Sequence, residues 1–117
     1  MRRIILESPY AGKNAEEIEK NKTYARACVR DSLVRGEAPI ASHLLYTQPG
    51  ILRDENPEER AWGIAAGLAW GEVATATAVY IDHGVSDGMQ KGIDAAHENN
   101  RPIEYRFLFN HKDVDHV

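Results

Sequence analysis

The chain has 117 residues, of which 43% are hydrophobic and 27% are charged, and its formal net charge is −4. This length suits one domain with a single core, and the composition is that of a folded globular protein rather than a disordered one. The negative net charge argues against general binding to a nucleic acid backbone. The longest mainly apolar run, residues 74–81, is too short to cross a bilayer, so we expect no membrane partner.

The chain start and the cysteine content bear on the cellular location. The first residues are basic but turn polar at Glu7, so they lack the apolar region of a signal peptide. The single cysteine, Cys28, cannot form an internal disulfide, and its helical spacing predicts a core position. Both features favour a cytoplasmic location.

The first half of the chain predicts strand, helix and strand in that order. Residues 4–6 are apolar and end at a Ser-Pro turn, which predicts a short buried strand. Asn14, with Glu17 three residues later, predicts the start of a helix that ends at Gly36. Residues 38–42 predict a weaker second strand.

The middle of the chain predicts a long loop followed by a helix. Residues 43–56 have no periodicity and predict an exposed loop, of a length that is often functional. Asn56 and Pro57 then favour the start of a helix over residues 57–73.

The second half of the chain completes an alternating pattern. Residues 75–81 are β-branched and aromatic and predict a third strand. Ser86 begins a helix that reaches about Asn99, and residues 101–109 predict a fourth strand. This alternation predicts an α/β fold of the small Rossmann-like (flavodoxin-like) type, with four parallel strands and helices on both faces. Residues 1–110 are expected to form one domain and residues 111–117 a polar tail.

Glycines recur along the helix predicted for residues 57–73. Gly63, Gly67 and Gly71 are four residues apart and form a bare stripe on one face. Such a stripe packs closely either on the sheet or on a helix of another subunit. Trp62 and Trp70 share a second face of the same helix.

The carboxyl ends of the strands are the expected ligand site, because ligands of open parallel sheets bind there. Three segments should meet at this edge, namely residues 7–14, 42–48 and 82–89. The first and third lead directly into helices, whose N-termini present free N–H groups and a partial positive charge. The edge therefore suits a ligand that carries a phosphate or carboxylate.

Four side chains in these segments have the right chemistry for a ligand. Tyr10 and Tyr46 offer flat surfaces for a base or a sugar, His43 can exchange a proton, and Asp82 follows the third strand. Structural explanations stay open for three of them. Tyr10 can cover the rim of the sheet, His43 can bond a backbone group, and Asp82 can brace its own turn.

Motifs for a metal or a cofactor are weak. Residues 84–88 only loosely match a dinucleotide fingerprint, and the chain has neither a phosphate loop nor a nucleophile elbow. Four tail residues could chelate a metal, but such tails are usually solvated: His111, Asp113, Asp115 and His116. We therefore expect no metal and no cofactor.

Three stretches carry a resemblance to a known group: "ILESPYAG", "GEAPIASHLLYTQ" and "YIDHGVSDGMQKGIDAAHENNRPIEYRFL". Over about residues 3–108 they resemble the nucleoside 2-deoxyribosyltransferase-like superfamily, and most of all an uncharacterised bacterial and phage branch. The superfamily includes deoxynucleoside monophosphate N-glycosidases. The resemblance implies a Rossmann-like nucleotide-binding domain over residues 1–110, a nucleotide-like small molecule at the strand ends, and a homodimer or higher homo-oligomer.

The resemblance also implies a reaction, but one residue departs from it. Catalytic members cleave an N-glycosidic bond through a glutamate near the start of the helix that follows a Ser-x-Gly-Thr/Met turn. Ser86, Gly88 and Met89 match the turn, whereas Gly92 stands where the glutamate is expected. Tyr10 and His43 match, respectively, an aromatic residue of the first loop and a histidine found after the second strand in some glycosidases.

A carboxylate is needed beside the anomeric carbon for such cleavage, together with a proton for the departing base. Without one at Gly92 the candidates are Asp82, Asp87 and Glu7, and Asp82 is best placed. Glu7 either faces the ligand or lies on the wrong side of its strand.

Because the expected acid is missing, we predict binding without efficient turnover, for sensing or sequestration. The alternative is an N-glycosidase or deoxyribosyltransferase with a relocated acid. The predicted catalytic residues are Asp82 and His43. The predicted ligand-binding residues lie in the three strand-end segments: Ser8, Pro9, Tyr10, Gly12, Tyr46, Gly84, Ser86, Asp87, Gly88 and Met89.

Overall fold

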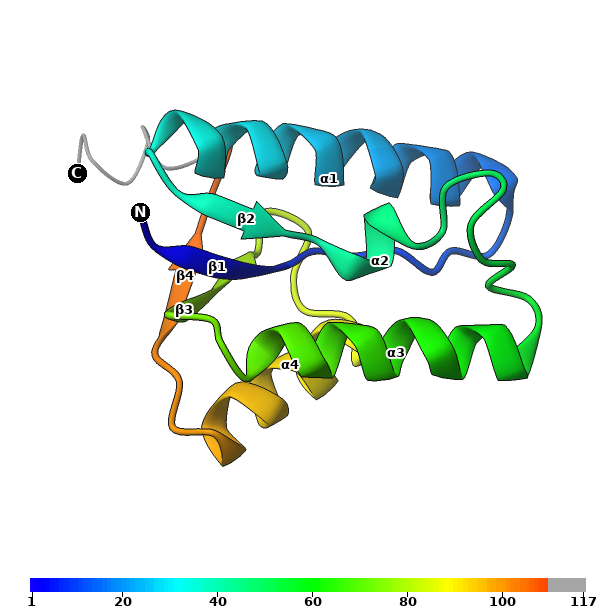
Figure 1. The fold of residues 1–117 in the computed structure, drawn as a ribbon. Helices are drawn as coiled ribbons and strands as arrows, with labels where there is room; N and C mark the ends of the chain where they lie inside the picture. The colour runs from blue at the N-terminus through cyan, green and yellow to red at the C-terminus, as the bar shows by residue number, and fades with distance from the viewer. Residues whose placement is uncertain (110–117) are drawn as a thin grey trace.

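Four parallel strands form the centre of the fold in the computed structural model, which describes residues 1–109 (Figure 1). Their order across the sheet is β2-β1-β3-β4. The strands are β1 (Arg3–Glu7), β2 (Ala38–Ile40), β3 (Ala76–Tyr80) and β4 (Ile103–Arg106). The predicted parallel α/β sheet is thereby confirmed. The four tail residues considered as metal ligands lie outside the described residues.

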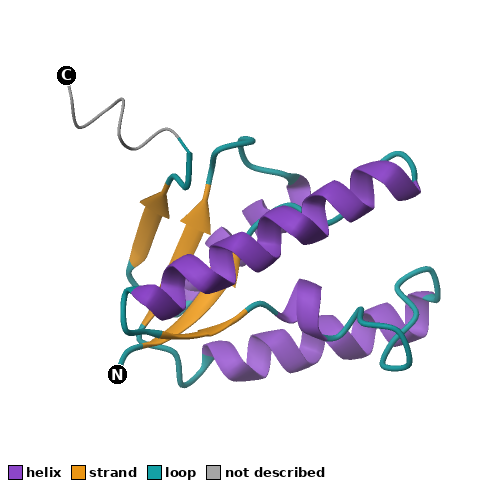
Figure 2. Ribbon diagram, turned by 90° about the horizontal axis from the view of Figure 1, so that it is seen from above, coloured by secondary structure: helices purple, strands orange, loops and turns teal. Residues whose placement is uncertain are grey.

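Helices cover both faces of this sheet (Figure 1). The long helix α1 (Ala15–Val34) covers one face, and α3 (Pro57–Gly71) and α4 (Asp87–Glu98) lie on the other. Figure 2, seen from above, shows α1 in front of the strands. A short helix, α2 (Ser42–Leu45), begins directly after β2, in part of the segment predicted to be an irregular loop. Within residues 1–109, no helix has the length and apolar character needed to cross a membrane.

Each long helix begins at a polar side chain that the sequence indicates. The Asn14 side chain accepts a hydrogen bond from the N–H of Glu17 at 2.9 Å. Asn56 accepts from two N–H groups at the start of α3, and Ser86 accepts from the N–H of Met89. Gly36 follows α1 with φ = +82°, a backbone conformation that glycine adopts without steric cost. These local signals explain why the predicted helix starts are correct.

The alternation of side chains along β1 decides which residues reach which face. Ile4 and Leu6 are buried against α1, where they join Tyr24 and Cys28. Ile5 and Glu7 point to the opposite face, the one covered by α3 and α4. On that face Val79, the register partner of Glu7, packs on Met89 and Ile93 of α4.

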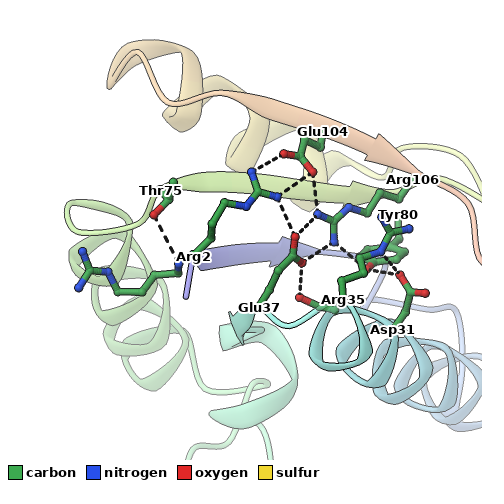
Figure 3. Close-up of polar contacts among 10 residues, drawn as sticks. Arg2, Asp31, Arg35, Glu37, Thr75, Tyr80, Glu104 and Arg106 are labelled. Carbon is green, nitrogen blue, oxygen red and sulfur yellow. Dashed lines mark hydrogen bonds and ion pairs between the residues drawn. The ribbon is translucent and has the colours of Figure 1, made fainter.

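An ion-pair network centred on Glu37 ties the edge strand β4 to the start of β2 (Figure 3). Glu37 accepts hydrogen bonds from Arg106 at 2.7 and 2.8 Å, from Arg2 at 2.7 Å and from Ser32 of α1 at 2.8 Å. Both Arg2 and Arg106 also pair with Glu104 at 2.7 Å. The side chains of Glu37 and Arg106 are 7% and 4% exposed. The network therefore buries an ion pair that links segments far apart in the sequence.

The glycine stripe of α3 contacts its own chain. A Cβ atom on Gly67 would lie 2.7 Å from the hydroxyl oxygen of Ser42, and one on Gly71 would lie 3.2 Å from the guanidinium of Arg101. A Cβ atom on Gly63 would lie 3.2 Å from the side chain of Leu52. The stripe thus brings α3 close to α2 and to the segment before β4, rather than being open for another subunit.

Candidate functional site

A cavity of about 660 Å³ lies on the face of the sheet covered by α3 and α4. Its wall includes Ile5 and Glu7 of β1, and the neighbouring walls come from the turn after β1, from α2, and from α3 and α4. Eight of the predicted site residues line it: Ser8, Tyr10, His43, Tyr46, Ser86, Asp87, Gly88 and Met89. The size falls in the range of small-molecule sites, roughly 300–1,000 Å³.

Glu7 places a carboxylate in this cavity. Burial raises the pKa of Glu7 to about 7, although the positive charge of Arg101 acts in the opposite direction. No hydrogen bond from the described residues contributes to this pKa. Glu7 is half-buried, and a partly desolvated carboxylate that no protein group donates to is costly to keep charged. Groups with pKa values shifted in this way concentrate at functional sites.

The Glu7 carboxylate fills the space beside Gly92 of α4. A Cβ atom built on Gly92 would overlap Oε2 and Cδ of Glu7 and would lie 2.8 Å from Oε1. Any side chain at residue 92 would therefore displace the carboxylate. Gly92 also lines the cavity, so the absence of a side chain there makes room for a group that comes from β1.

Ser8 and His43 form a polar pair beside Glu7. The hydroxyl oxygen of Ser8 and Nε2 of His43 are 2.7 Å apart, and both residues line the cavity. Burial lowers the pKa of His43 to about 4, so the imidazole is neutral at pH 7. A neutral imidazole can accept or donate a proton through its two ring nitrogens. The pair joins α2 to the end of β1 and orients the His43 ring.

Asp82 lies elsewhere, between α1 and the segment that follows β4. Its carboxylate accepts hydrogen bonds from the Tyr24 hydroxyl at 2.5 Å and from the N–H groups of Leu108 and Phe109 at 2.8 and 2.9 Å. Burial raises the pKa of Asp82, but these hydrogen bonds outweigh it and the net pKa is lowered. Asp82 is not among the residues that line the cavity. The geometry thus gives this carboxylate a bracing contact, the structural alternative left open for Asp82, and the catalytic role of Asp82 stays a prediction.

Three predicted ligand-binding residues also lie outside the lining of the cavity: Pro9, Gly12 and Gly84. Gly12 is required for packing, since a Cβ atom there would lie 2.6 Å from the Cβ of Glu17. Gly84 has φ = +82°, which explains a glycine in the turn before α4. Both glycines shape the loops whose other residues reach the cavity.

Charged residues outside the predicted strand-end segments also line the cavity. Arg101 donates from Nε to the Thr77 hydroxyl at 2.9 Å and from Nη1 to the carbonyl oxygen of Gly71 at 2.7 Å. It is 9% exposed, and it precedes a strand rather than following one, so the strand-end rule does not point to it. Arg60 of α3 and Lys91 of α4 add two more positive charges to the walls.

Apolar residues of α3 form part of the same lining. Ile64 and Leu68 face the cavity and are 53% and 55% exposed. Together with Tyr10 and Tyr46 they provide a surface on which a flat, partly apolar group can rest. Among residues 1–109, no group of three His, Cys, Asp or Glu side chains is arranged to hold a metal ion.

The comparison with solved structures identifies a fold relative. The chain is similar to a 2-deoxyribosyltransferase from the psychrotolerant bacterium Bacillus psychrosaccharolyticus, with a TM-score of 0.63 and 17% sequence identity. The match covers 98% of this chain and 91% of the relative. At this identity the likeness establishes the shared fold, which agrees with the superfamily resemblance of the sequence.

Sequence comparisons give one further result. No curated protein matches the chain in sequence. A family model described as "Domain of unknown function (DUF7768)" matches residues 2–106, which is nearly the whole described domain. Because this model matches most of the chain, the chain belongs to the DUF7768 family.

Proposed function

We propose that the α3–α4 cavity binds a nucleoside phosphate or a closely related nucleotide-like ligand. One observation carries the proposal: the cavity joins two tyrosines, the neutral His43 and the start of α4 in a space of about 660 Å³. The aromatic rings suit the base or sugar, and the free N–H groups at the start of α4 suit a phosphate. The fold shared with a 2-deoxyribosyltransferase supports the same ligand class.

The cavity wall carries both carboxylates and cations, and two of its cations, on α3 and α4, can pair with an anionic group of the ligand. Lys91 lies in the second turn of this helix, so its ammonium adds to the positive potential of the helix start. Arg60 contributes a further positive charge from α3. Lys91 and Arg60 are both exposed residues, which is compatible with binding a solvated phosphate.

Thermal unfolding with a panel of nucleosides and nucleoside monophosphates tests this proposal. A phosphorylated ligand at a hundred times its dissociation constant should stabilise the protein by about 2.7 kcal/mol, and the matching nucleoside should stabilise it less. Lys91→Met should reduce the stabilisation by the phosphate, while Lys20→Met on the remote helix α1 should not. If the whole panel, including cyclic nucleotides and ADP-ribose, leaves the melting temperature unchanged, the ligand class is wrong.

Cleavage of an N-glycosidic bond is a second candidate function, and a specific observation favours it. The prediction of binding without turnover depended on the missing side chain at residue 92. A carboxylate from Glu7 lies in the space beside that residue. The alternative of a relocated acid therefore has structural support, with Glu7 rather than Asp82 as the acid.

A further inference from the structure

Glu7 and Gly92 depend on each other sterically. The carboxylate of Glu7 reaches from the end of β1 to the backbone of α4, and a Cβ atom at residue 92 would overlap it. A carboxylate can therefore be carried into this part of the cavity by the strand or by the helix, but not by both without rearrangement. In this chain the strand carries it.

The surroundings of the Glu7 carboxylate are those of a reactive group rather than of a structural one. Structural carboxylates of this fold are saturated with donors, as Glu37 and Asp82 are. Glu7 lines the cavity without a hydrogen bond from the described residues, and the nearby charge is that of Arg101. The carboxylate is thus left free for a group that enters the cavity.

We propose that Glu7 is the catalytic carboxylate of this site, carried by β1 into the space next to Gly92, and that it attacks the anomeric carbon of a bound nucleoside monophosphate. The inference rests on the ligand class proposed above. It adds the residue that carries out the reaction. It also explains the position of that residue, because the strand supplies the carboxylate in the space that the missing side chain of Gly92 leaves open.

The reaction that follows is a hydrolysis in two steps. A carboxylate oxygen of Glu7 forms a bond to the anomeric carbon while the carbon–nitrogen bond breaks, and the bonding electron pair leaves with the base. The base takes a proton from water. The hydroxide left behind adds to the anomeric carbon and releases the Glu7 carboxylate unchanged. One water is consumed, and the products are the free base and a sugar phosphate.

Chromatographic detection of free base from the deoxynucleoside monophosphates and ribonucleoside monophosphates tests the role of Glu7. The wild type should release base, and Glu7→Gln should lower the rate by roughly 10²–10⁴-fold, the scale of losing a positioned catalytic group. The nucleotide-induced rise in melting temperature should persist in Glu7→Gln, because the amide keeps the shape of the side chain. The exposed Glu98→Gln is the matched control and should leave the rate unchanged.

A second set of variants tests whether the carboxylate can be supplied by residue 92 of α4 in place of residue 7 of β1. Gly92→Glu alone places two side chains in one space and should destabilise the protein. The double variant Glu7→Ala/Gly92→Glu carries the carboxylate on the helix, and it should release base at least tenfold faster than Glu7→Ala. A folded double variant as inactive as Glu7→Ala would overturn the idea that residue 92 can take the place of residue 7.

The failures of the two proposals are distinguishable. A wild type that is stabilised by nucleotides but releases no base from any of them overturns the catalytic role of Glu7 and leaves the ligand class standing. Base release that survives in Glu7→Gln also overturns that role, and it places the acid at another residue. A wild type that is neither stabilised nor active contradicts the ligand class itself.

Discussion

The carboxylate of Glu7 makes the protein less stable in its ionised form. Its ordinary pKa is 4.5, and burial raises it to about 7 in the folded state. Besides Arg101, the cavity is lined by His43, whose imidazole is neutral at pH 7, and by six other titratable side chains: Tyr10, Tyr46, Asp54, Arg60, Asp87 and Lys91. The folded chain therefore holds the Glu7 proton more tightly than the unfolded chain does between pH 4.5 and 7. Stability from this group is fully present below pH 4.5 and is lost as the pH rises through about 7.

Glu7→Gln should consequently stabilise the protein at alkaline pH. The rise in pKa corresponds to roughly 3 kcal/mol of unfolding free energy once Glu7 is ionised, which is an upper value for the gain. Urea unfolding should give a clear advantage of the variant at pH 8 and none below pH 4.5. The exposed Glu98→Gln should show no such pH-dependent advantage. An equal free energy of unfolding for wild type and Glu7→Gln at pH 8 would show that ionisation of Glu7 does not destabilise the folded protein.

At the scale of the elements, β4 depends on the buried ion-pair network around Glu37. Removing one partner of a buried pair leaves an uncompensated charge, so Glu37→Gln should cost about 3–5 kcal/mol. The hydrogen bond from Arg106 is the main cause that lowers the pKa of Glu37 to about 2. Its stabilisation is therefore present above pH 4.5 and is lost as the pH falls towards about 2.

Urea unfolding of Glu37→Gln and of Glu16→Gln provides the comparison. Glu16 makes only an exposed pair with Lys20 on α1, which is worth at most about 0.5 kcal/mol. The two variants should differ strongly at pH 7, and the deficit of Glu37→Gln should shrink at pH 3. Similar losses of unfolding free energy in both variants would mean that the buried network stabilises the protein no more than an exposed ion pair does.

At the scale of the whole molecule, helix α3 exposes a large apolar surface. Gly71 is its only buried residue, and Trp62 and Trp70 are 55% and 49% exposed. Val73, just beyond the end of the helix, is 52% exposed. The glycine stripe is occupied by α2 and Arg101 of the same chain, so these side chains, rather than the stripe, form the apolar surface of α3 that is left exposed. Large exposed apolar patches of this kind mark interaction sites.

We predict a homodimer, or a higher homo-oligomer, formed through the outer face of α3. Trp62→Lys should convert it to a monomer in light scattering, because the charge cannot be buried in the contact without a partner. Leu33→Lys, an equally exposed change on α1, should leave the assembly intact. A wild-type monomer at tens of micromolar would contradict the prediction. The cytoplasmic location stays a prediction in the same way.

The local sequence determined most of the secondary structure. Helices begin at Asn14, Asn56 and Ser86 because these side chains accept hydrogen bonds from backbone N–H groups only two or three residues away. The alternation of strands and helices likewise restricts the sheet to a parallel one. Such features depend on neighbours in the chain, so they can be predicted from it. The Ser86–Met89 turn and His43, both predicted to belong to the site, also line the cavity.

The tertiary structure alone decided which carboxylate enters the cavity. From the sequence, Asp82 and Glu7 both follow the same rule for residues at strand ends. The alternation along β1, with Leu6 buried against α1, turns Glu7 towards α4, whereas Asp82 accepts hydrogen bonds from Tyr24 and from the backbone after β4. Whether a side chain faces the ligand depends on strand register and on partners distant in sequence, and a one-residue change in register reverses the face. For the same reason, only the packed structure shows that the missing side chain of Gly92 makes room for Glu7.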